Sequence, residues 1–340
     1  MKRLVQTAFA AWLASSAALY AQDYPAPVPL AEGAQAPIAA KDTGDGIRIA
    51  YMPPATEFAY YTAIGEGIKV AAAAKGAEVF MLAPQSGADI NGQMGMIQDV
   101  ITQDVDAIIL STHDEAAAAP LVTRAVAKGI AVIIVNNDIP NFPTPLHAVV
   151  GYSQRNGTTS IGKYLVEKSA GAPLVVAVIE GQPGYHSTER VAGFLAGIEG
   201  ASNITVAASI PGGWNVEGGN TAGMDILTAH PDINVLFAAN DYMIMGAGVA
   251  AKSLGRKVML LGNDGDTAAL EEIAGGTVTA TVNTTPFVMG QIALNVTMDV
   301  LAGTYPGGFV ETPTTIVDSA NILPVLQAPD KLFPQPSKSY

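Results

Sequence analysis

The feature that most restricts the fold of this sequence is a regular alternation of short apolar runs with longer amphipathic stretches. Residues 47–52, 77–83, 106–110 and 130–135 are predominantly apolar, and stretches with helical periodicity separate them. A continuous apolar run is typical of a strand covered on both faces, and strands joined by helices form parallel sheets. The sequence therefore predicts an α/β fold built on parallel sheets.

The same pattern starts again after Gly151. The second set of predicted strands comprises residues 173–180, 204–210, 234–239, 257–261 and 277–282. Two consecutive sets of strand–helix units predict two similar lobes, each a doubly wound sheet. A further predicted helix at residues 286–302 is left over, so we expect the chain to cross back and add it to the first lobe.

The overall composition argues against several classes of partner. The chain has 340 residues, of which 49% are hydrophobic and 14% are charged, so it can form a large core. Its net charge of -13 makes nucleic acids and anionic membranes poor partners. The absence of cysteine excludes disulfides and a lipid attached at a cysteine.

The N-terminal segment has the composition of a secretory signal. Lys2 and Arg3 precede an apolar, Ala-rich run that ends near Ala21. This pattern predicts a signal peptide at residues 1–21 and export to a bacterial periplasm. A membrane anchor is less well supported, because the apolar run is short and a polar segment follows it. Residues 22–46 are rich in proline, alanine and glycine and are predicted to form a flexible leader.

Three apolar runs end in an amide beside an acid: VIIVNND (132–138), VLFAAND (235–241) and VMLLGND (258–264). Ligands of open parallel sheets bind beyond the carboxyl ends of the strands, so these joins are candidate binding positions. Helix capping is the alternative at any single join, since Asn and Asp are favoured N-caps. We predict that Asn240 and Asp264 face a ligand and that Asp241 is an N-cap.

Aromatic residues are scarce, at 6%, yet several follow the predicted strand ends. Phe58, Tyr60 and Tyr61 follow the first strand, although one of the two tyrosines is expected to be core. Trp214 stands in a loop after two glycines, where no core is evident. Amides and carboxylates can bind sugar hydroxyls, and aromatic faces can cover the apolar faces of a sugar ring. This combination favours a polyhydroxylated ligand.

The enzyme interpretations have little support. Gly65–Glu66–Gly67 resembles part of a dinucleotide-binding fingerprint, but it lies inside a predicted helix rather than at its start. The four histidines lack metal-ligand spacing, although His113 and His186 follow strand ends and could line a cleft. Nothing in the pattern assembles a nucleophile, a base and an oxyanion hole. We therefore expect no catalytic residues, no metal and no cofactor.

Three stretches carry a resemblance to a known family: ILTAHPDINVLFAAND (226–241), VMLLGNDG (258–265) and ERVAGF (189–194). From Ile47 to about Leu326 the chain resembles the periplasmic sugar-binding proteins of ABC transporters, in the ribose/galactose-binding group. Repressors of the lactose-repressor type share this core. A predicted signal peptide rather than a helix-turn-helix precedes Ile47, which argues against the repressor branch.

The resemblance implies a periplasmic binding protein of type I, with two lobes joined by a three-segment hinge and a ligand enclosed by hinge closure. The expected crossings are at 152–153, 284–285 and 312–314. The first lobe would then comprise residues 47–152 and 285–312, the second lobe residues 153–284 and 313–328, and a tail residues 329–340. We expect a monomer.

The resemblance also assigns site residues. The aromatic pair of the family matches Tyr60 and Tyr61, and its hinge polar residue matches Asn283 or Thr284. An arginine of ribose binders aligns with Thr188, while Arg190 matches a structural arginine. The predicted ligand-binding set is Phe58, Tyr60, Tyr61, His113, Asn136, Asn137, Thr188, Trp214, Asn240, Asn263, Asp264 and Asn283.

Ribose binders have Asp-Arg where this chain has Asn136–Asn137. Neutral amides cannot replace the bidentate fork of arginine, so the resemblance disfavours ribose and favours a neutral polyol or a differently shaped sugar. The predicted function is capture of a sugar or sugar alcohol and its delivery to an ABC permease. Two alternatives are a receptor module that presents a signal molecule to a membrane sensor and a secreted enzyme on the same scaffold.

Overall fold

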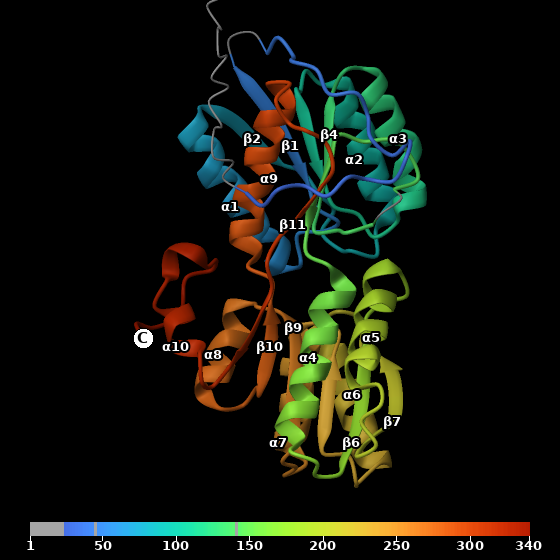
Figure 1. The fold of residues 1–340 in the computed structure, drawn as a ribbon, viewed down its shortest axis with the longest axis vertical. Helices are drawn as coiled ribbons and strands as arrows, with labels where there is room; N and C mark the ends of the chain where they lie inside the picture. Colours follow the sequence, from blue (N-terminus) through green and yellow to red (C-terminus); the bar gives the residue numbers. More distant parts are fainter. Residues whose placement is uncertain (1–23, 44–45, 140–141) are drawn as a thin grey trace, which may run out of the picture.

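The computed structural model describes residues 24–43, 46–139 and 142–340, and it consists of two lobes stacked along the long axis of the molecule (Figure 1). Each lobe contains one six-stranded sheet, with strand order β11-β5-β4-β3-β1-β2 in the first and β12-β10-β9-β8-β6-β7 in the second. All pairings are parallel except that of β10 with β12, which is antiparallel. The predicted fold of two similar doubly wound lobes is therefore confirmed, apart from this edge strand.

The first lobe is built from the first five strands and three helices, to which a later helix and strand return. Its strands are β1 (Ile47–Met52), β2 (Ala77–Met81), β3 (Ala107–Leu110), β4 (Ala131–Val135), β5 (Ala148–Gly151) and β11 (Phe309–Glu311). Its helices are α1 (Ala59–Lys75), α2 (Ile90–Thr102), α3 (Glu115–Ala127) and α9 (Pro286–Leu301).

The second lobe repeats the plan. Its strands are β6 (Leu174–Glu180), β7 (Ile204–Pro211), β8 (Val235–Ala238), β9 (Met259–Asp264), β10 (Ala280–Asn283) and β12 (Thr315–Asp318). Its helices are α4 (Gln154–Ser169), α5 (Tyr185–Ile198), α6 (Val216–Ala229), α7 (Asp241–Ser253), α8 (Thr267–Gly275) and α10 (Ile322–Leu326), followed by a 3-10 turn at Pro329–Lys331.

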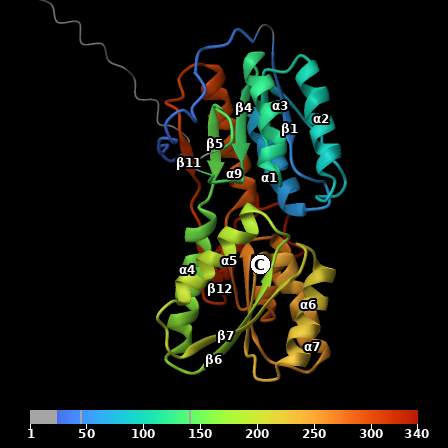
Figure 2. The same cartoon turned by 90° about the vertical axis from the view of Figure 1, so that its right-hand side faces the viewer.

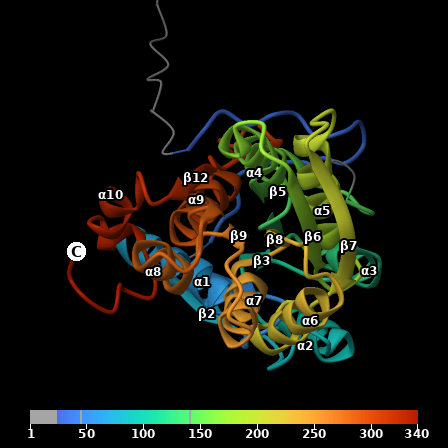
Figure 3. The ribbon, with the colours of Figure 1, turned by 90° about the horizontal axis from the view of Figure 1, so that it is seen from below.

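Helices cover both faces of each sheet, which explains the continuous apolar strands. In the first lobe α1 and α9 pack on one face, while α2 and α3 pack on the other. In the second lobe α4 and α5 cover one face, and α6, α7, α8 and α10 cover the other (Figure 3). Because every central strand lies between two helical layers, its side chains are buried in both directions.

The return of α9 to the first lobe depends on close helix packing. A Cβ at Gly67 in α1 would lie 1.9 Å from the carbonyl oxygen of Phe287, and a Cβ at Gly290 in α9 would lie 2.0 Å from that of Ile64. Only glycine permits this approach at both positions. Gly67, which resembles part of a nucleotide-binding fingerprint in the sequence, therefore has a packing role.

The chain passes between the sheets three times, as Figure 2 shows. The crossings follow β5, β10 and β11, so they are formed by residues 152–153, 284–285 and 312–314. Tyr152, Thr284 and Thr312 in these crossings are buried. The two lobes are thus connected by three short segments that lie at one side of the space between them.

The interpretation of residues 22–46 as a flexible leader is wrong for the described part of this segment. Val28 forms a bridge with Phe309 at the sheet edge, and Gln35 forms one with Leu146. The hydroxyl of buried Tyr24 donates to Asp299 at 2.6 Å. Composition missed these contacts because backbone pairing to an exposed sheet edge needs no periodic apolar pattern.

The C-terminal tail, predicted at residues 329–340, also packs on its neighbour. Leu332 is buried in the core of the second lobe, and Tyr340 packs against the same cluster. The backbone of Ser337 donates to the carboxylate of Glu271. The predicted signal peptide at residues 1–21 lies outside the described residues. Among the described helices, none has the length and hydropathy needed to span a bilayer.

Several short elements were absent from the sequence prediction. These are strands β5, β11 and β12, with three or four residues each, and helix α8. Runs this short carry too few residues for a periodic pattern to stand out. Strands β11 and β12 are edge strands, and β5 lies between β11 and β4, so these strands extend the sheets without changing the two-lobe plan.

Candidate ligand-binding site

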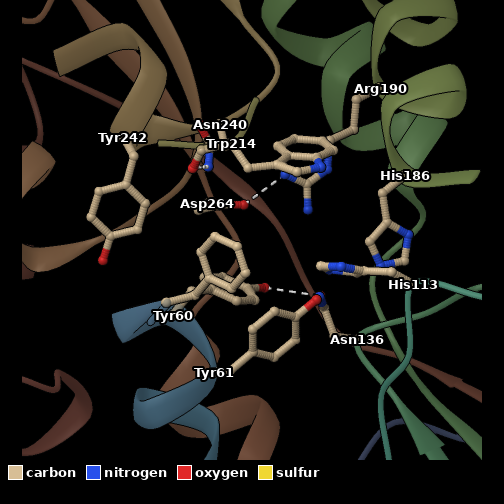
Figure 4. Close-up of a pocket in the computed structure, with 11 residues that line it drawn as sticks. Tyr60, Tyr61, His113, Asn136, His186, Arg190, Trp214, Asn240, Tyr242 and Asp264 are labelled. Carbon is tan, nitrogen blue, oxygen red and sulfur yellow. Dashed lines mark hydrogen bonds and ion pairs between the residues drawn. The ribbon is translucent and has the colours of Figure 1, made fainter. Parts of the chain in front are cut away.

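A cavity with an empty volume of about 380 Å³ lies between the lobes, near the carboxyl ends of the strands of both sheets (Figure 4). We call it the main cavity. The first lobe contributes Phe58, Tyr60, Tyr61, His113 and Asn136, and the second lobe contributes His186, Arg190, Trp214, Asn240, Tyr242 and Asp264. Its location is the edge at which open α/β sheets bind ligands, so the topology alone makes it the candidate site.

Three aromatic rings form the first-lobe wall. Helix α1 begins directly after Phe58, so Tyr60 and Tyr61 stand in its first turn. The ring centroid of Tyr61 lies 5.7 Å from that of Tyr60 and 6.1 Å from that of Phe58, with both pairs edge to face. Both tyrosines line the cavity and also belong to the first-lobe core, so the expected core role applies to both of them and does not separate either from the site.

Asn136 completes this wall from the end of β4. It has a φ of 58°, a left-handed conformation that Asn adopts more readily than most residues. Its Oδ1 accepts from the Tyr60 hydroxyl at 3.1 Å, and its Nδ2 donates to the Tyr61 hydroxyl at 3.4 Å. Burial raises the pKa of both tyrosines and lowers that of His113, so the first-lobe wall is polar but uncharged.

The second lobe supplies a buried ion pair. Nη1 of Arg190 donates to Oδ1 of Asp264 at 2.9 Å, and the two side chains are only 4% and 5% exposed. Nη1 also donates to the carbonyl of Ala239, and Nε donates to Oε1 of Gln154 at 2.7 Å. Among the described residues, Nη2 has no such partner, so Arg190 retains a donor at the cavity.

Asp264 has an unusual backbone conformation and an unusual pKa. Its φ of 139° lies in a region that side chains other than glycine rarely adopt, which indicates backbone strain at this strand end. Burial raises the pKa of its carboxyl to about 7, although Arg190 opposes this shift. Nearby Asp241, whose pKa burial raises to about 6, and Asp266 are buried as well. One buried arginine therefore faces a cluster of three carboxyl groups.

Trp214 forms the opposing aromatic surface. It follows Gly213 in the loop after β7 and has a φ of 69°. A Cβ at Gly181 would lie 2.0 Å from the indole, so the ring packs directly against that backbone. The guanidinium carbon of Arg190 lies 5.4 Å from the indole centroid. The ring is thus held between backbone and a cation at the border of the cavity.

Two histidines meet across the lobes at one end of the cavity. The ring centroids of His113 and His186 are 6.5 Å apart. Nδ1 of His113 lies 3.4 Å from the carbonyl of Gly87, whereas the buried Nε2 of His186 has no hydrogen-bond partner among the described residues. Burial lowers the pKa of both rings, so they are neutral near pH 7.

Residues 49–304 match the model of the periplasmic binding protein domain. This match covers most of the chain. The chain belongs to the periplasmic binding protein family. A curated relative is the D-ribose/D-allose-binding protein of Pseudomonas aeruginosa, 29% identical, with 67% of this chain and 75% of that protein covered. Another is the ribose import binding protein RbsB of Bacillus subtilis, 28% identical, with coverages of 72% and 78%.

Solved structures show the same two-lobe architecture. A periplasmic solute-binding protein from Actinobacillus succinogenes with bound D-allose superposes with a TM-score of 0.76 at 26% identity, covering 81% of this chain and 99% of that chain. The Caulobacter myo-inositol binding protein, at 24% identity, has a TM-score of 0.75, with 84% and 97% covered. These similarities support the fold assignment independently of the short sequence motifs.

In this binding protein, most of the residues predicted from the sequence come together at the main cavity. Those that line it are Phe58, Tyr60, Tyr61, His113, Asn136, Trp214, Asn240 and Asp264. The other predicted residues, Asn137, Thr188, Asn263 and Asn283, are not part of its lining. Whether the lining residues contact a ligand remains a prediction.

The resemblance aligned a binding arginine with Thr188 and gave Arg190 a structural match, but in the structure Arg190 lines the cavity and Thr188 does not. Thr188 is exposed on α5, whereas Arg190 is buried and lines the cavity. Residues two positions apart point to different sides of a helix, so only one of them can face the cavity. His186 and Arg190 are four positions apart and share the inward face. That spacing is the signal that could have identified both residues.

Three amides that were predicted as ligand contacts have internal partners instead. Oδ1 of Asn137 accepts from the backbone of Ile139 at 2.7 Å. Nδ2 of Asn263 donates to the Tyr152 hydroxyl at 3.0 Å, and Oδ1 of Asn283 accepts from the backbone of Thr285 at 2.9 Å. The contacts of Asn137 and Asn283 close turns next to strand ends, and that of Asn263 joins β9 to the first crossing between the lobes. Sequence cannot distinguish these uses of an amide from ligand binding.

The roles of Asn240 and Asp241 are divided differently from the prediction. Asn240, not Asp241, caps α7, because its Oδ1 accepts from the backbone of Met243 at 2.9 Å. Asp241 is fully buried, and its Oδ2 accepts from the backbone of Gly265 and Asp266. Asn240 lines the cavity while it caps the helix, so capping and cavity lining coincide in one residue.

Tyr242 was noted as a strand-end aromatic but was not included in the predicted set, yet it lines the cavity. Its hydroxyl lies 3.4 Å from Oδ1 of Asp266. Tyr242 stands in the first turn of α7, as Tyr60 and Tyr61 do in α1. Comparing the first turns of equivalent helices would have identified it. Among the described residues, no group of three or more potential ligands could hold a metal ion.

Proposed function

We propose that this protein captures a sugar or sugar alcohol between its two lobes and delivers it to the permease of an ABC transporter. The observation that carries this proposal is the main cavity, which combines aromatic walls from both lobes with a buried Arg190–Asp264 pair. Aromatic faces suit the C–H surfaces of a ring, and charged or amide groups suit its hydroxyls. The relatives named for ribose and allose support the same ligand class.

The chemistry of the cavity favours a neutral ligand. Arg190 is the cation of the lining, and Asp264 already pairs with it. A ligand carboxylate would approach Asp264 and the neighbouring Asp266 without a cation of its own. A hydroxyl can instead accept from Nη2 of Arg190 and donate to Asp264, so neither charged group is left without a partner in the dry cavity.

The position of Arg190 changes the argument about ribose. Ribose was disfavoured because two arginines of ribose binders were absent from the aligned positions, but Arg190 brings one arginine to the cavity. The other reason remains, since Asn137 stands where ribose binders have the second arginine, and Asn136 beside it leaves the first-lobe wall uncharged. We therefore expect a neutral sugar or polyol other than ribose to bind most tightly.

We also propose that residues 1–21 are removed on export and that the protein acts in the periplasm. The composition of the N-terminal segment supports this proposal, as does the match to a family described as periplasmic. N-terminal sequencing of protein recovered from a periplasmic fraction should begin at Gln22. Recovery of the uncleaved chain in the cytoplasm would contradict export.

A thermal-shift screen tests the binding function directly. The panel should contain pentoses, hexoses, tetritols, inositols and linear polyols, with sugar acids as a charged comparison. A ligand that binds only the folded state at a concentration about 100 times its Kd stabilises that state by about 2.7 kcal/mol, which is readily detected. No shift with any neutral compound would overturn the proposal, and chemical turnover of a bound sugar would indicate an enzyme instead.

A further inference from the structure

A second cavity adjoins the main one between the lobes. We call it the mouth cavity, because Gln182, Pro183 and Gly184 on its border are exposed. It has an empty volume of about 340 Å³. The complete lining is Thr112, His113, Glu115, Gln182, Pro183, Gly184, Tyr185, His186, Ser187 and Trp214. His113, His186 and Trp214 line both cavities, so these three side chains form the partition between them.

The mouth cavity is acidic, and the two histidines in its lining, His113 and His186, are uncharged near pH 7. Glu115 is its ionisable acid, and among the described residues no lysine, arginine or histidine forms an ion pair with it. Its side chain accepts a long hydrogen bond, 3.5 Å from Nδ2 of Asn137, and also interacts with its own backbone N–H. Burial raises the pKa of Glu115, and the neighbouring Asp114 adds to this effect. The carboxyl group therefore stands in a partly dry site without a cation.

A second acid reinforces this character from the same side. The Tyr185 hydroxyl, at the border of the mouth cavity, donates to Oδ1 of Asp138 at 3.2 Å. Burial raises the pKa of Tyr185, as do Asp138, Glu189 and Glu115, so the hydroxyl stays neutral in this acidic surrounding. Arg155 lies near the same groups and pairs with Glu189. The three carboxyl groups outnumber this one arginine, so the net negative charge around the mouth cavity would attract a cation.

The partition contains an unsatisfied polar atom. Nε2 of His186 is buried and has no hydrogen-bond partner in the part of the chain that the structure describes, although its ring borders both cavities. Burial of a polar atom without a partner is unfavourable, so its presence at this position indicates a missing partner. A ligand that extends from one cavity to the other would pass this atom.

We propose that the mouth cavity is a second subsite, which binds an ammonium-bearing extension of a ligand whose neutral ring occupies the main cavity. This inference rests on the proposed sugar-binding function and specifies the chemical class of a substituent on the ligand. Glu115 pairs with the ammonium group, and the carbonyl oxygen of the Gln182 side chain accepts a further hydrogen bond from it. His186 Nε2 gains a partner from the atoms that join the ring to the extension.

Calorimetric titration of the full chain with matched glycosides tests this subsite. The probes are 2-aminoethyl and 4-aminobutyl glycosides of D-ribose, D-allose and D-glucose, each beside its hydroxyl counterpart and the parent monosaccharide. For at least one sugar, the amine should bind about tenfold or more tighter than the hydroxyl analogue, because a charge-assisted hydrogen bond replaces a neutral one. Glu115→Gln should remove most of that preference.

Two further variants control the result. Gln182→Glu places a second carboxylate in the same cavity on an exposed residue and should strengthen the preference for the amine. Glu217→Gln makes the same charge change as Glu115→Gln at an exposed position that lines neither cavity, so it should leave every affinity unchanged.

The outcomes separate this inference from the function on which it rests. Parent sugars that bind without any preference for the amine would overturn the subsite and leave the sugar-binding function intact. A preference for the amine that survives in Glu115→Gln and is unchanged in Gln182→Glu would also overturn it. Failure of every parent sugar and glycoside to bind would overturn both proposals.

Discussion

The two lobes share one topology but bring different chemistry to the cavity between them. The fourth strand of each lobe ends in a polar residue with a positive φ, Asn136 after β4 and Asp264 at the end of β9. In the first lobe this residue is an amide bonded to two tyrosines. In the second lobe it is a carboxylate paired with Arg190.

This difference indicates that the lobes have unequal roles in binding. The second lobe holds the buried charges of the cavity, whose hydrogen bonds are stronger than those of neutral groups. The first lobe holds aromatic rings and uncharged polar groups, which cover a ligand and exclude water. A similar scaffold can therefore anchor a ligand with one lobe and enclose it with the other. Substitutions in the second lobe should cost more affinity than those in the first.

The largest effect is expected from Asp264→Ala. Affinity for the preferred sugar should fall by more than about tenfold, since the change removes a charged hydrogen-bond acceptor and leaves buried Arg190 without its partner. The unliganded protein should also melt at a lower temperature. Calorimetry and thermal unfolding measure the two effects, and Asp264→Asn is the control that keeps the shape. Unchanged affinity would place the site elsewhere.

Trp214→Ala should remove most of the ligand-induced rise in Tm while it changes the Tm of the unliganded protein little. The indole is partly exposed at the cavity, so its loss affects a bound ring more than the core. We expect a loss of about 2 kcal/mol in binding, which is comparable to other aromatic anchors. Trp214→Phe should retain part of the shift. An intact shift in Trp214→Ala would show that the indole does not contact the ligand.

Asn136→Ala should have a smaller effect, of about 1 kcal/mol in binding, because it removes neutral hydrogen bonds only. Asn137→Ala is the matched control, since its side chain closes a turn outside the cavity lining. That control should retain the wild-type Kd. If Asn136→Ala weakened binding more than Asp264→Ala, the unequal roles of the lobes would be contradicted.

The smallest expected effect is a change in how the Tm depends on pH. Burial raises the pKa of Asp264 to about 7 and that of Asp241 to about 6, so between about pH 4 and pH 7 the folded protein holds protons that the unfolded chain has lost. This contribution to stability is present at low pH and falls as pH rises through the folded-state values. Asp264→Asn cannot ionise, so its Tm should fall less over this range than that of the wild type.

The histidines between the lobes have the opposite effect on the pH dependence of stability. Burial lowers the pKa of His113 and His186, so their contribution to stability is present above about pH 6.5 and is lost as pH falls further. Differences between wild-type and variant Tm at each pH isolate the carboxyl contribution. Parallel curves for the wild type and Asp264→Asn would show that Asp264 does not titrate differently in the two states.

Much of the fold could be predicted because buried parallel strands leave a strong signal. The runs at residues 47–52 and 235–238 are apolar over their whole length or nearly so, and the helix predicted at residues 286–302 matches α9 within one residue. The leader and the tail could not be predicted in this way. Their contacts, such as Gln35 with His147, depend on backbone groups that become available only when the sheet has formed.

A site residue could be predicted where its side chain type is unusual for its position in the sequence. Prediction was less successful for polar residues, which can either stabilise the fold or bind a ligand. Trp214, in a loop after two glycines, has no core to enter, and it lines the cavity. Asn263 and Asn283 look like ligand contacts in the sequence, yet they bond to the fold itself. An amide uses the same atoms to bond within the fold and to bind a ligand, so the residue type alone does not show which of the two it does.

The sequence by itself determined the two parallel-sheet lobes and the strand ends at which a site could form, because apolar periodicity and topology follow from local composition. Only the tertiary structure decided which polar residues face the cavity. Arg190 and Thr188 differ by two positions on one helix, and the packing of α5 turns Arg190 inward and Thr188 to solvent. Helix orientation depends on contacts with the other elements of the lobe, and a single sequence does not contain that information.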